Sequence, residues 1–112
     1  MKLEDIFASS PVITAVKDDT GLTHAVEKDC TIVFILYGNV CNIPSIVEKV
    51  KERGKLAIVH VDLIAGLSSK EVAVDYIKEN TRADGIISTR PGMVKRAMEL
   101  GLIGGQRAFL ID

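Results

Sequence analysis

The residues best suited to ligand chemistry stand in two short clusters. His60 lies two residues before a carboxylate, Asp62, and such a pair can act as a general base, a metal ligand or a hydrogen-bonding group for a ligand. Ser88, Thr89 and Arg90 combine two hydroxyls with a guanidinium, which suits the binding of phosphate or carboxylate. Two charged residues that also stand at the ends of expected strands complete the candidate set: Lys17 and Asp112. Together these residues predict a site for a small anionic, hydroxyl-bearing molecule.

Simpler interpretations of the same residues stay open. His60 and Asp62 can satisfy each other and orient a loop, while Arg90 can pair with Asp62 or Asp112 and tie loop ends together. Alternatively, Arg90 contacts an anion beside Pro91 and Gly92, where a helix is expected to begin with free backbone N–H groups. We expect no metal site, because no third ligand stands at a suitable spacing. No catalytic residue is assigned.

Composition narrows the class of protein. The chain has 112 residues, a formal net charge of -1 and 4% aromatic residues without tryptophan, which argues against a generally basic, base-stacking surface. The acidic N-terminus lacks the pattern of a signal peptide, and the longest apolar run, residues 32–37, is too short to cross a membrane. Cys30 and Cys41 form no CxxC pair. We expect a cytoplasmic protein with reduced thiols.

Apolar runs of strand length alternate with segments of helical period. Strands are expected at residues 12–16, 31–37, 56–61, 85–89 and 107–111. A leading helix is expected around residues 3–7, a short one around 22–26, one from Asn42 to a Gly54 C-cap, one opened by a Ser68–Glu71 capping box and one at 93–100. Gly104 and Gly105 are expected to form the turn into the last strand.

This alternation predicts one α/β unit, residues 1–112, with a parallel sheet and right-handed crossovers. Two architectures fit. A doubly wound sheet of five strands nearly fits the length. A (β/α)8 barrel of the TIM type requires about 200 residues or more, so this chain would supply its first five strands. In both, ligands bind at the carboxyl ends of the strands, where the candidate residues are expected to gather.

The doubly wound option resembles a response-regulator receiver domain. Asp18 and Asp19 would follow the first strand, Asp62 the third, and the hydroxyl of Ser88 or Thr89 the fourth. The chain departs from that pattern because its last strand ends in an acid rather than a lysine and no closing helix follows. His60 and Arg90 also have no counterpart there.

A closer resemblance is to the glycerol-3-phosphate-responsive antiterminator family, regulators of glycerol-uptake operons. It rests on the blocks VHVDLIAGL (59–67), DGIISTR (84–90) and QRAFLID (106–112), with PVITAV (11–16) similar to the opening strand. The resemblance implies a TIM-type (β/α) barrel, no catalytic turnover and no cofactor. It also implies binding of glycerol 3-phosphate and then of leader mRNA, so that transcription passes a terminator.

Under this resemblance His60 and Asp62 would contact hydroxyls, while Arg90 with Ser88 would hold the anionic end of the ligand. The rest of the ligand-facing set would be Thr89, Lys17 and Asp112. The family continues through three further βα units, and phosphate sites in such barrels often use the last loops. We therefore expect either a fragment of a longer barrel or a chain that completes its sheet by self-association. The alternative function is a (β/α)-barrel enzyme for a small phosphorylated substrate, with His60 as base and Arg90 on the phosphate.

Overall fold

The computed structural model describes residues 1–107, in which five β-strands alternate with helices. In chain order the elements are α1 (Leu3–Phe7), β1 (Ile13–Val16), α2 (Asp19–Glu27), β2 (Ile32–Ile35), α3 (Ile43–Lys51), β3 (Leu56–His60), the 3-10 helix η1 (Val61–Leu63), α4 (Val72–Asn80), β4 (Gly85–Ser88), α5 (Pro91–Glu99) and β5 (Ile103–Gln106). No helix among residues 1–107 is long and apolar enough to cross a membrane.

The strands form one parallel sheet in the consecutive order β1-β2-β3-β4-β5. This order decides between the two expected architectures. A doubly wound sheet reverses its strand order at a switch point, whereas a (β/α) barrel adds each strand beside the previous one. The sheet is therefore of the barrel type, and the receiver-domain interpretation is wrong. The five strands do not close into a barrel within the described residues.

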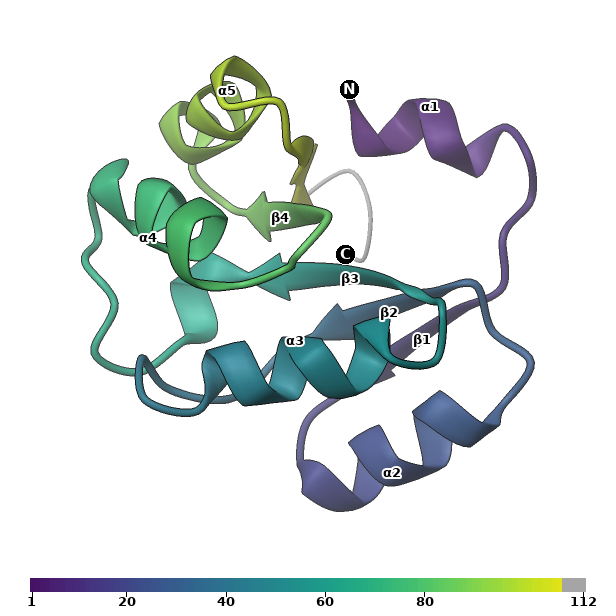
Figure 1. Ribbon diagram of the computed structural model, residues 1–112. Helices are drawn as coiled ribbons and strands as arrows, with labels where there is room; N and C mark the ends of the chain where they lie inside the picture. The colour runs from purple at the N-terminus through teal and green to yellow at the C-terminus, as the bar shows by residue number, and fades with distance from the viewer. Residues whose placement is uncertain (108–112) are drawn as a thin grey trace.

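Two apolar clusters lie on opposite faces of the sheet. Helices α2 to α5 follow one another along the outer face (Figure 1), and their buried side chains pack on outward residues such as Val33 and Val59. The inner face carries Phe34, Ile58 and Ile87, and α1 covers this cluster with the fully buried Leu3. The central strands are apolar on both sides because both faces of the sheet are covered, as is usual in parallel sheets.

The fifth strand of the described residues, β5, lies earlier than the strand expected at 107–111, of which only residue 107 is described. Gly104 and Gly105, expected to form a turn, belong to β5 itself and pair with Ile86 and Ile87 of β4. The sequence predicts a turn at these two residues because glycine is a poor strand former. The structure shows why glycine fits there: a Cβ at Gly104 would lie 3.0 Å from the backbone oxygen of Val94, so α5 packs directly on this strand.

The expected capping box is also absent. The Ser68 hydroxyl accepts a hydrogen bond from the Lys70 amide, and α4 begins only at Val72, after Glu71. At the end of α3 the expectation holds, because Gly54 adopts a positive φ of 74°.

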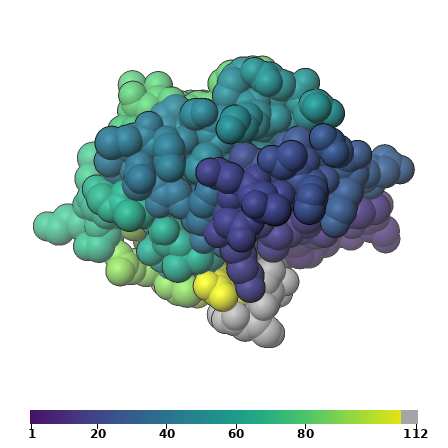
Figure 2. Space-filling view, turned by 90° about the horizontal axis from the view of Figure 1, so that it is seen from below, coloured from purple at the N-terminus to yellow at the C-terminus, as the bar shows by residue number. Residues whose placement is uncertain are grey.

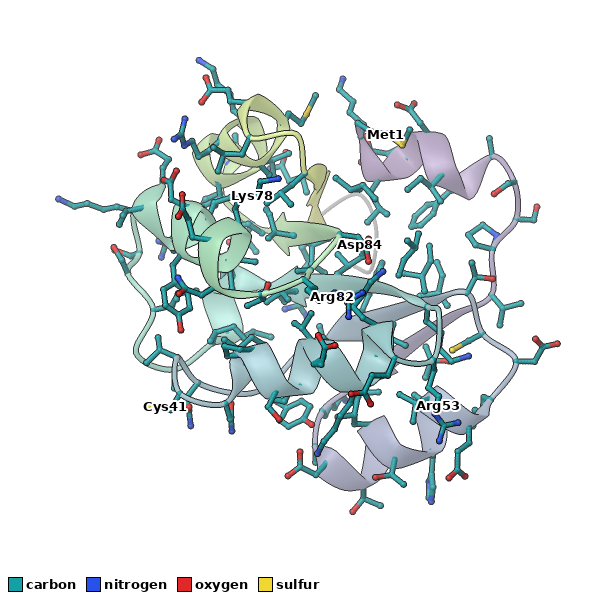
Figure 3. The ribbon with its side chains drawn as sticks, viewed as in Figure 1. Met1, Cys41, Arg53, Lys78, Arg82 and Asp84 are labelled. Carbon is teal, nitrogen blue, oxygen red and sulfur yellow. The ribbon has the colours of Figure 1, made fainter. Side chains whose placement is uncertain are left out.

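Ion pairs and buried donors stabilise the amino ends of the strands. The carboxylate of Asp84 accepts hydrogen bonds from the Lys51 ammonium and from the Ala57 amide, both at 2.8 Å. Figure 3 places Asp84 where β4 begins and Cys41 on the opposite side, in the loop before α3. Cys41 is exposed, whereas Cys30 is buried, and both are free thiols.

Candidate functional site

Three of the expected site residues form one network at the carboxyl ends of β3 and β4. The carboxylate of Asp62 accepts hydrogen bonds from the Ser88 hydroxyl (2.7 Å), the Thr89 amide (2.8 Å) and the Thr89 hydroxyl (2.7 Å). Asp62 lies in η1 rather than on a continuing strand, because β3 ends at His60. The Asp62 side chain is therefore turned toward the neighbouring strand and connects two loops.

The network also sets the charge state of Asp62. Burial alone would raise the pKa of this carboxyl, but the hydrogen bonds from Thr89 and Ser88 favour the charged form more strongly. The net effect is a pKa of Asp62 below its usual value. Asp62 is therefore an anion at neutral pH, and its oxygen atoms already receive three donors.

His60 is fully buried at the end of β3. It faces inward with Ile58 and stands beside Ile87 in the β3–β4 register. Its Nε2 atom lies 3.2 Å from a guanidinium nitrogen of Arg107, which directly follows β5. This contact links the end of β3 to the residue after β5, across β4.

Arg90 lies outside this network, although its backbone is connected to it. The Arg90 amide donates to the Ser88 hydroxyl at 3.0 Å, but the guanidinium donates to the backbone oxygen of Ser69, in the loop before α4. At the start of α5, a Glu71 carboxylate oxygen lies 3.1 Å from the position a Cβ would take on Gly92. The corner expected to attract an anion thus contains a carboxylate of the chain itself.

The acidic residues after β1 serve local structure. Asp18 caps α2 by accepting from the Gly21 amide at 2.7 Å, and Asp19 accepts from the Tyr37 hydroxyl at 2.6 Å. Burial, followed by this hydrogen bond and the charge of Asp19, raises the pKa of Tyr37 far above its usual value. Lys17 is exposed at the end of β1. The alternation of inward and outward residues along β1 places it on the same face as Ala15, opposite to the outward-facing Val16.

Asp112 lies outside the described residues. Within residues 1–107 no group of three His, Cys, Asp or Glu side chains stands close enough together to hold a metal ion. The sequence leaves open whether Arg107 or Asp112 faces the site, because it does not show which face of the last strand points inward. The structure places the Arg107 guanidinium beside His60.

Comparison with known proteins identifies relatives of this chain. Residues 12–112 match the family described as glycerol-3-phosphate responsive antiterminator. YgcP of Escherichia coli strain K12, an uncharacterized protein, is 45% identical over all 112 residues, and the chain spans 59% of its length.

Two crystal structures share the fold. The glycerol uptake operon antiterminator regulatory protein of Listeria monocytogenes 4b F2365 superposes with a TM-score of 0.83 and 26% identity, over 95% of this chain and 56% of that one. A glycerol uptake operon antiterminator-related protein of Thermotoga maritima MSB8 gives a TM-score of 0.73 and 28% identity, over 84% of this chain and 52% of that one. The chain thus spans little more than half the length of these structures. With a family match over nearly its whole length, the chain belongs to the glycerol-3-phosphate-responsive antiterminator family.

Proposed function

We propose that this protein is a cytoplasmic metabolite sensor that binds glycerol 3-phosphate and, in the bound form, leader mRNA, so that transcription of genes for glycerol uptake and metabolism passes a terminator. The observation that carries the proposal is the family match over residues 12–112. The proposal assigns the protein no catalytic activity and no cofactor.

The ligand would bind at the carboxyl ends of the strands. His60 and the network of Asp62, Ser88 and Thr89 lie there on adjacent strands, and they supply polar groups suited to a polyol. Lys17 and Asp112 are the outer members of the proposed set. Arg90 would act as a tie between loops, through the oxygen of Ser69.

Ligand binding would act on RNA through the loops that the site connects. Asp62 joins the β3 end to the β4 end, and Arg90 joins the β4 end to the loop before α4. A ligand that binds better to one arrangement of these loops shifts the population toward it, and RNA that prefers this arrangement then binds more tightly. The net charge of -1 requires RNA to contact a local patch or another part of the whole protein.

Calorimetric titration with glycerol 3-phosphate tests the proposal, with glycerol and inorganic phosphate as separate controls. We expect saturable binding of the phosphate ester, with a higher affinity than that for glycerol or for inorganic phosphate. A gel shift with leader RNA, with and without the ester, then tests the regulatory step. No binding of the ester by this chain or by its longer relatives contradicts the proposal. Turnover of the ester would favour the barrel enzyme instead.

A further inference from the structure

We propose that Thr89 selects the ligand by hydrogen-bond polarity: its hydroxyl oxygen accepts a hydrogen bond from a hydroxyl of the ligand, and Asp62 is the positioning residue that keeps it an acceptor. The inference rests on the proposed function and deepens it, because it states which chemical group this part of the site recognises. That group is a hydroxyl, which can donate, rather than a carbonyl or phosphate oxygen, which can only accept.

The protons of the network have fixed directions. The backbone amides of Thr89 and Arg90 can only donate, and they donate to an Asp62 carboxylate oxygen (2.8 Å) and to the Ser88 hydroxyl oxygen (3.0 Å). The Asp62 carboxylate is ionised at neutral pH and can only accept. The hydroxyls of Ser88 and Thr89, each 2.7 Å from an Asp62 oxygen, therefore both direct their protons at Asp62. Neither hydroxyl keeps a proton for a ligand.

The two hydroxyls differ in their access to a ligand. Ser88 is fully buried, and its oxygen already accepts from the Arg90 amide. Thr89 is exposed and stands two residues after Ile87, whose side chain packs in the inner cluster. The alternation of side chains along β4 places Thr89 on this inner side, where His60 also lies. Thr89 is therefore the member of the network that presents its oxygen to a ligand.

The arrangement gives this side of the site a single polarity. The side-chain oxygens of Asp62 and Thr89 offer acceptors only, so a ligand hydroxyl completes the network by donating to Thr89. A carbonyl or phosphate oxygen at the same place would face these acceptors with no proton between them, and unpaired polar groups of this kind lower affinity. The phosphate end of the ester must then lie away from Asp62 and Thr89.

Calorimetric titration of this chain with glycerol 3-phosphate and two analogues tests the polarity. In the analogues, fluorine replaces either the terminal or the central hydroxyl, which changes the size little and removes the donor. One of the two should bind about 5- to 150-fold more weakly than the ester, the range expected when a hydrogen-bonding group is left unpaired. The comparison uses the unsubstituted protein, so it does not depend on the folding of a variant.

Thr89→Val assigns the difference between ester and analogue to a residue. Valine has nearly the same shape and no hydroxyl, so this variant should bind the ester more weakly and should no longer distinguish it from the affected analogue. Thr89→Ser keeps the hydroxyl and should keep the difference. Thr23→Val is the matched control and should leave both affinities unchanged. The Thr23 hydroxyl donates to the Asp19 backbone oxygen within α2, which lies on the outside of the molecule, dark blue in Figure 2.

Two substitutions of Asp62 test its positioning role. In Asp62→Asn, the Thr89 amide still requires the side-chain oxygen, which therefore stays beside the Thr89 hydroxyl and keeps its proton directed inward. The affinity ratio between ester and affected analogue should stay near the wild-type value. Asp62→Ala releases the Thr89 proton, which can then be donated to a ligand, and the ratio should fall toward one. A residue that only supports the loops would change both affinities and leave the ratio unaltered.

A measurement on the unsubstituted protein supports the same test. The Thr89 hydroxyl proton, held by a carboxylate, should be observed in proton NMR spectra at low temperature and should disappear in Thr89→Val. This readout applies even where Asp62→Ala does not fold.

The outcomes separate this inference from the proposed function. Absence of ester binding by the unsubstituted protein overturns both. If both fluorinated analogues bind as tightly as the ester, the polarity is wrong and the proposed function stands. A difference that persists in Thr89→Val overturns the assignment of Thr89. A ratio that is unchanged in Asp62→Ala, or a Thr89 hydroxyl proton that is absent from the spectra, overturns the positioning role of Asp62.

Discussion

Asp62 accepts hydrogen bonds from both polar groups of Thr89 and from the Ser88 hydroxyl, and its pKa lies below the usual value as a result. The unfolded chain takes up a proton at Asp62 at a higher pH than the folded protein does. Stability contributed by Asp62 is therefore fully present above about pH 4, the pKa of an unperturbed Asp, and is lost as pH falls further.

This linkage gives the first prediction. Asp62→Asn should lower the free energy of unfolding at neutral pH by about 1–3 kcal/mol, because the buried Ser88 hydroxyl and the Thr89 amide lose a charged acceptor. It should also flatten the acid side of the stability profile, measured as urea midpoints between about pH 2.5 and 7. Asp29→Asn, at an exposed carboxylate, should reproduce the wild-type profile. Parallel profiles for wild type and Asp62→Asn would show that this carboxylate contributes no pH dependence.

Gly85 gives a second prediction at the same scale. A Cβ on Gly85 would lie 2.3 Å from the backbone oxygen and 2.6 Å from the Cβ of Ile103, and neither atom can move without shifting β5. Gly85→Ala should cost about 3 kcal/mol or more, measured by chemical denaturation.

The comparison variant is Gly101→Ala. Gly101 has a φ of +80° and no neighbouring atom within 4 Å of a built Cβ, so the change introduces backbone strain without a collision. It should cost about 1–2 kcal/mol. A smaller loss for Gly85→Ala than for Gly101→Ala would contradict the collision argument.

At the scale of elements, Lys55 connects two turns at the amino ends of the strands. Its ammonium donates to the backbone oxygens of Lys28 (2.6 Å) and Cys30 (3.0 Å), between α2 and β2, while Lys55 itself precedes β3. Lys55→Met should therefore lower the free energy of unfolding by about 1–3 kcal/mol, because the backbone oxygens of Lys28 and Cys30 lose a charged donor. Thermal unfolding measures the loss. Lys49→Met, at an exposed position of α3, should behave like wild type, and an equal effect of both substitutions would refute the turn argument.

The elements also show what the sequence can predict. The order of strands and helices follows from hydrophobic period, and the meeting of Asp62, Ser88 and Thr89 follows from the rule that parallel strands end at one edge. The position of β5 does not follow, because Gly104 is selected by the close packing of α5 rather than by strand propensity. The predicted capping box does not form, because the Ser68 hydroxyl accepts a hydrogen bond from the Lys70 amide in a local turn. This hydrogen bond competes with the start of a helix at Ser68.

Side-chain direction at the site was the least predictable feature. Ser88, Thr89 and Arg90 are adjacent in sequence, yet Arg90 turns to the Ser69 oxygen while the two hydroxyls face Asp62. Residue type alone does not show that the Arg90 guanidinium donates to a backbone oxygen. Its direction depends on the three-dimensional arrangement of the loops.

For the whole molecule, both edges of the sheet carry apolar side chains at the surface. Beside β1 these are Val12 and Ile13, exposed to 57% and 37%, and beside β5 a hollow is lined by Val94 and Met98 of α5. At β5, Lys2 pairs with Gly104, whose amide donates to the Met1 oxygen at 2.9 Å. Open edges of this kind favour pairing with another chain.

The prediction is concentration-dependent self-association of the 112-residue chain, measured by size-exclusion chromatography with light scattering. Val12→Lys should shift the distribution toward the monomer, because a charge beside an edge strand opposes pairing. Ser45→Lys, at an exposed position of α3, which packs on the central strand β3, adds the same charge and should leave the distribution unchanged. A monomer at all concentrations, before any substitution, would contradict this prediction.

The consecutive strand order also governs the time course of folding. Each strand pairs with the strand made just before it, so βα units can assemble progressively while the chain is synthesised, and short sequence separations favour rapid folding. The pairing of Lys2 with Gly104 is the exception, since it joins residues at nearly opposite ends of the described chain. The amino-terminal segment must therefore wait for β5, and until then the inner cluster around Phe34 and Ile58 lacks the cover of Leu3. That interval is when a newly made chain would be most open to capture by a chaperone or by another nascent chain.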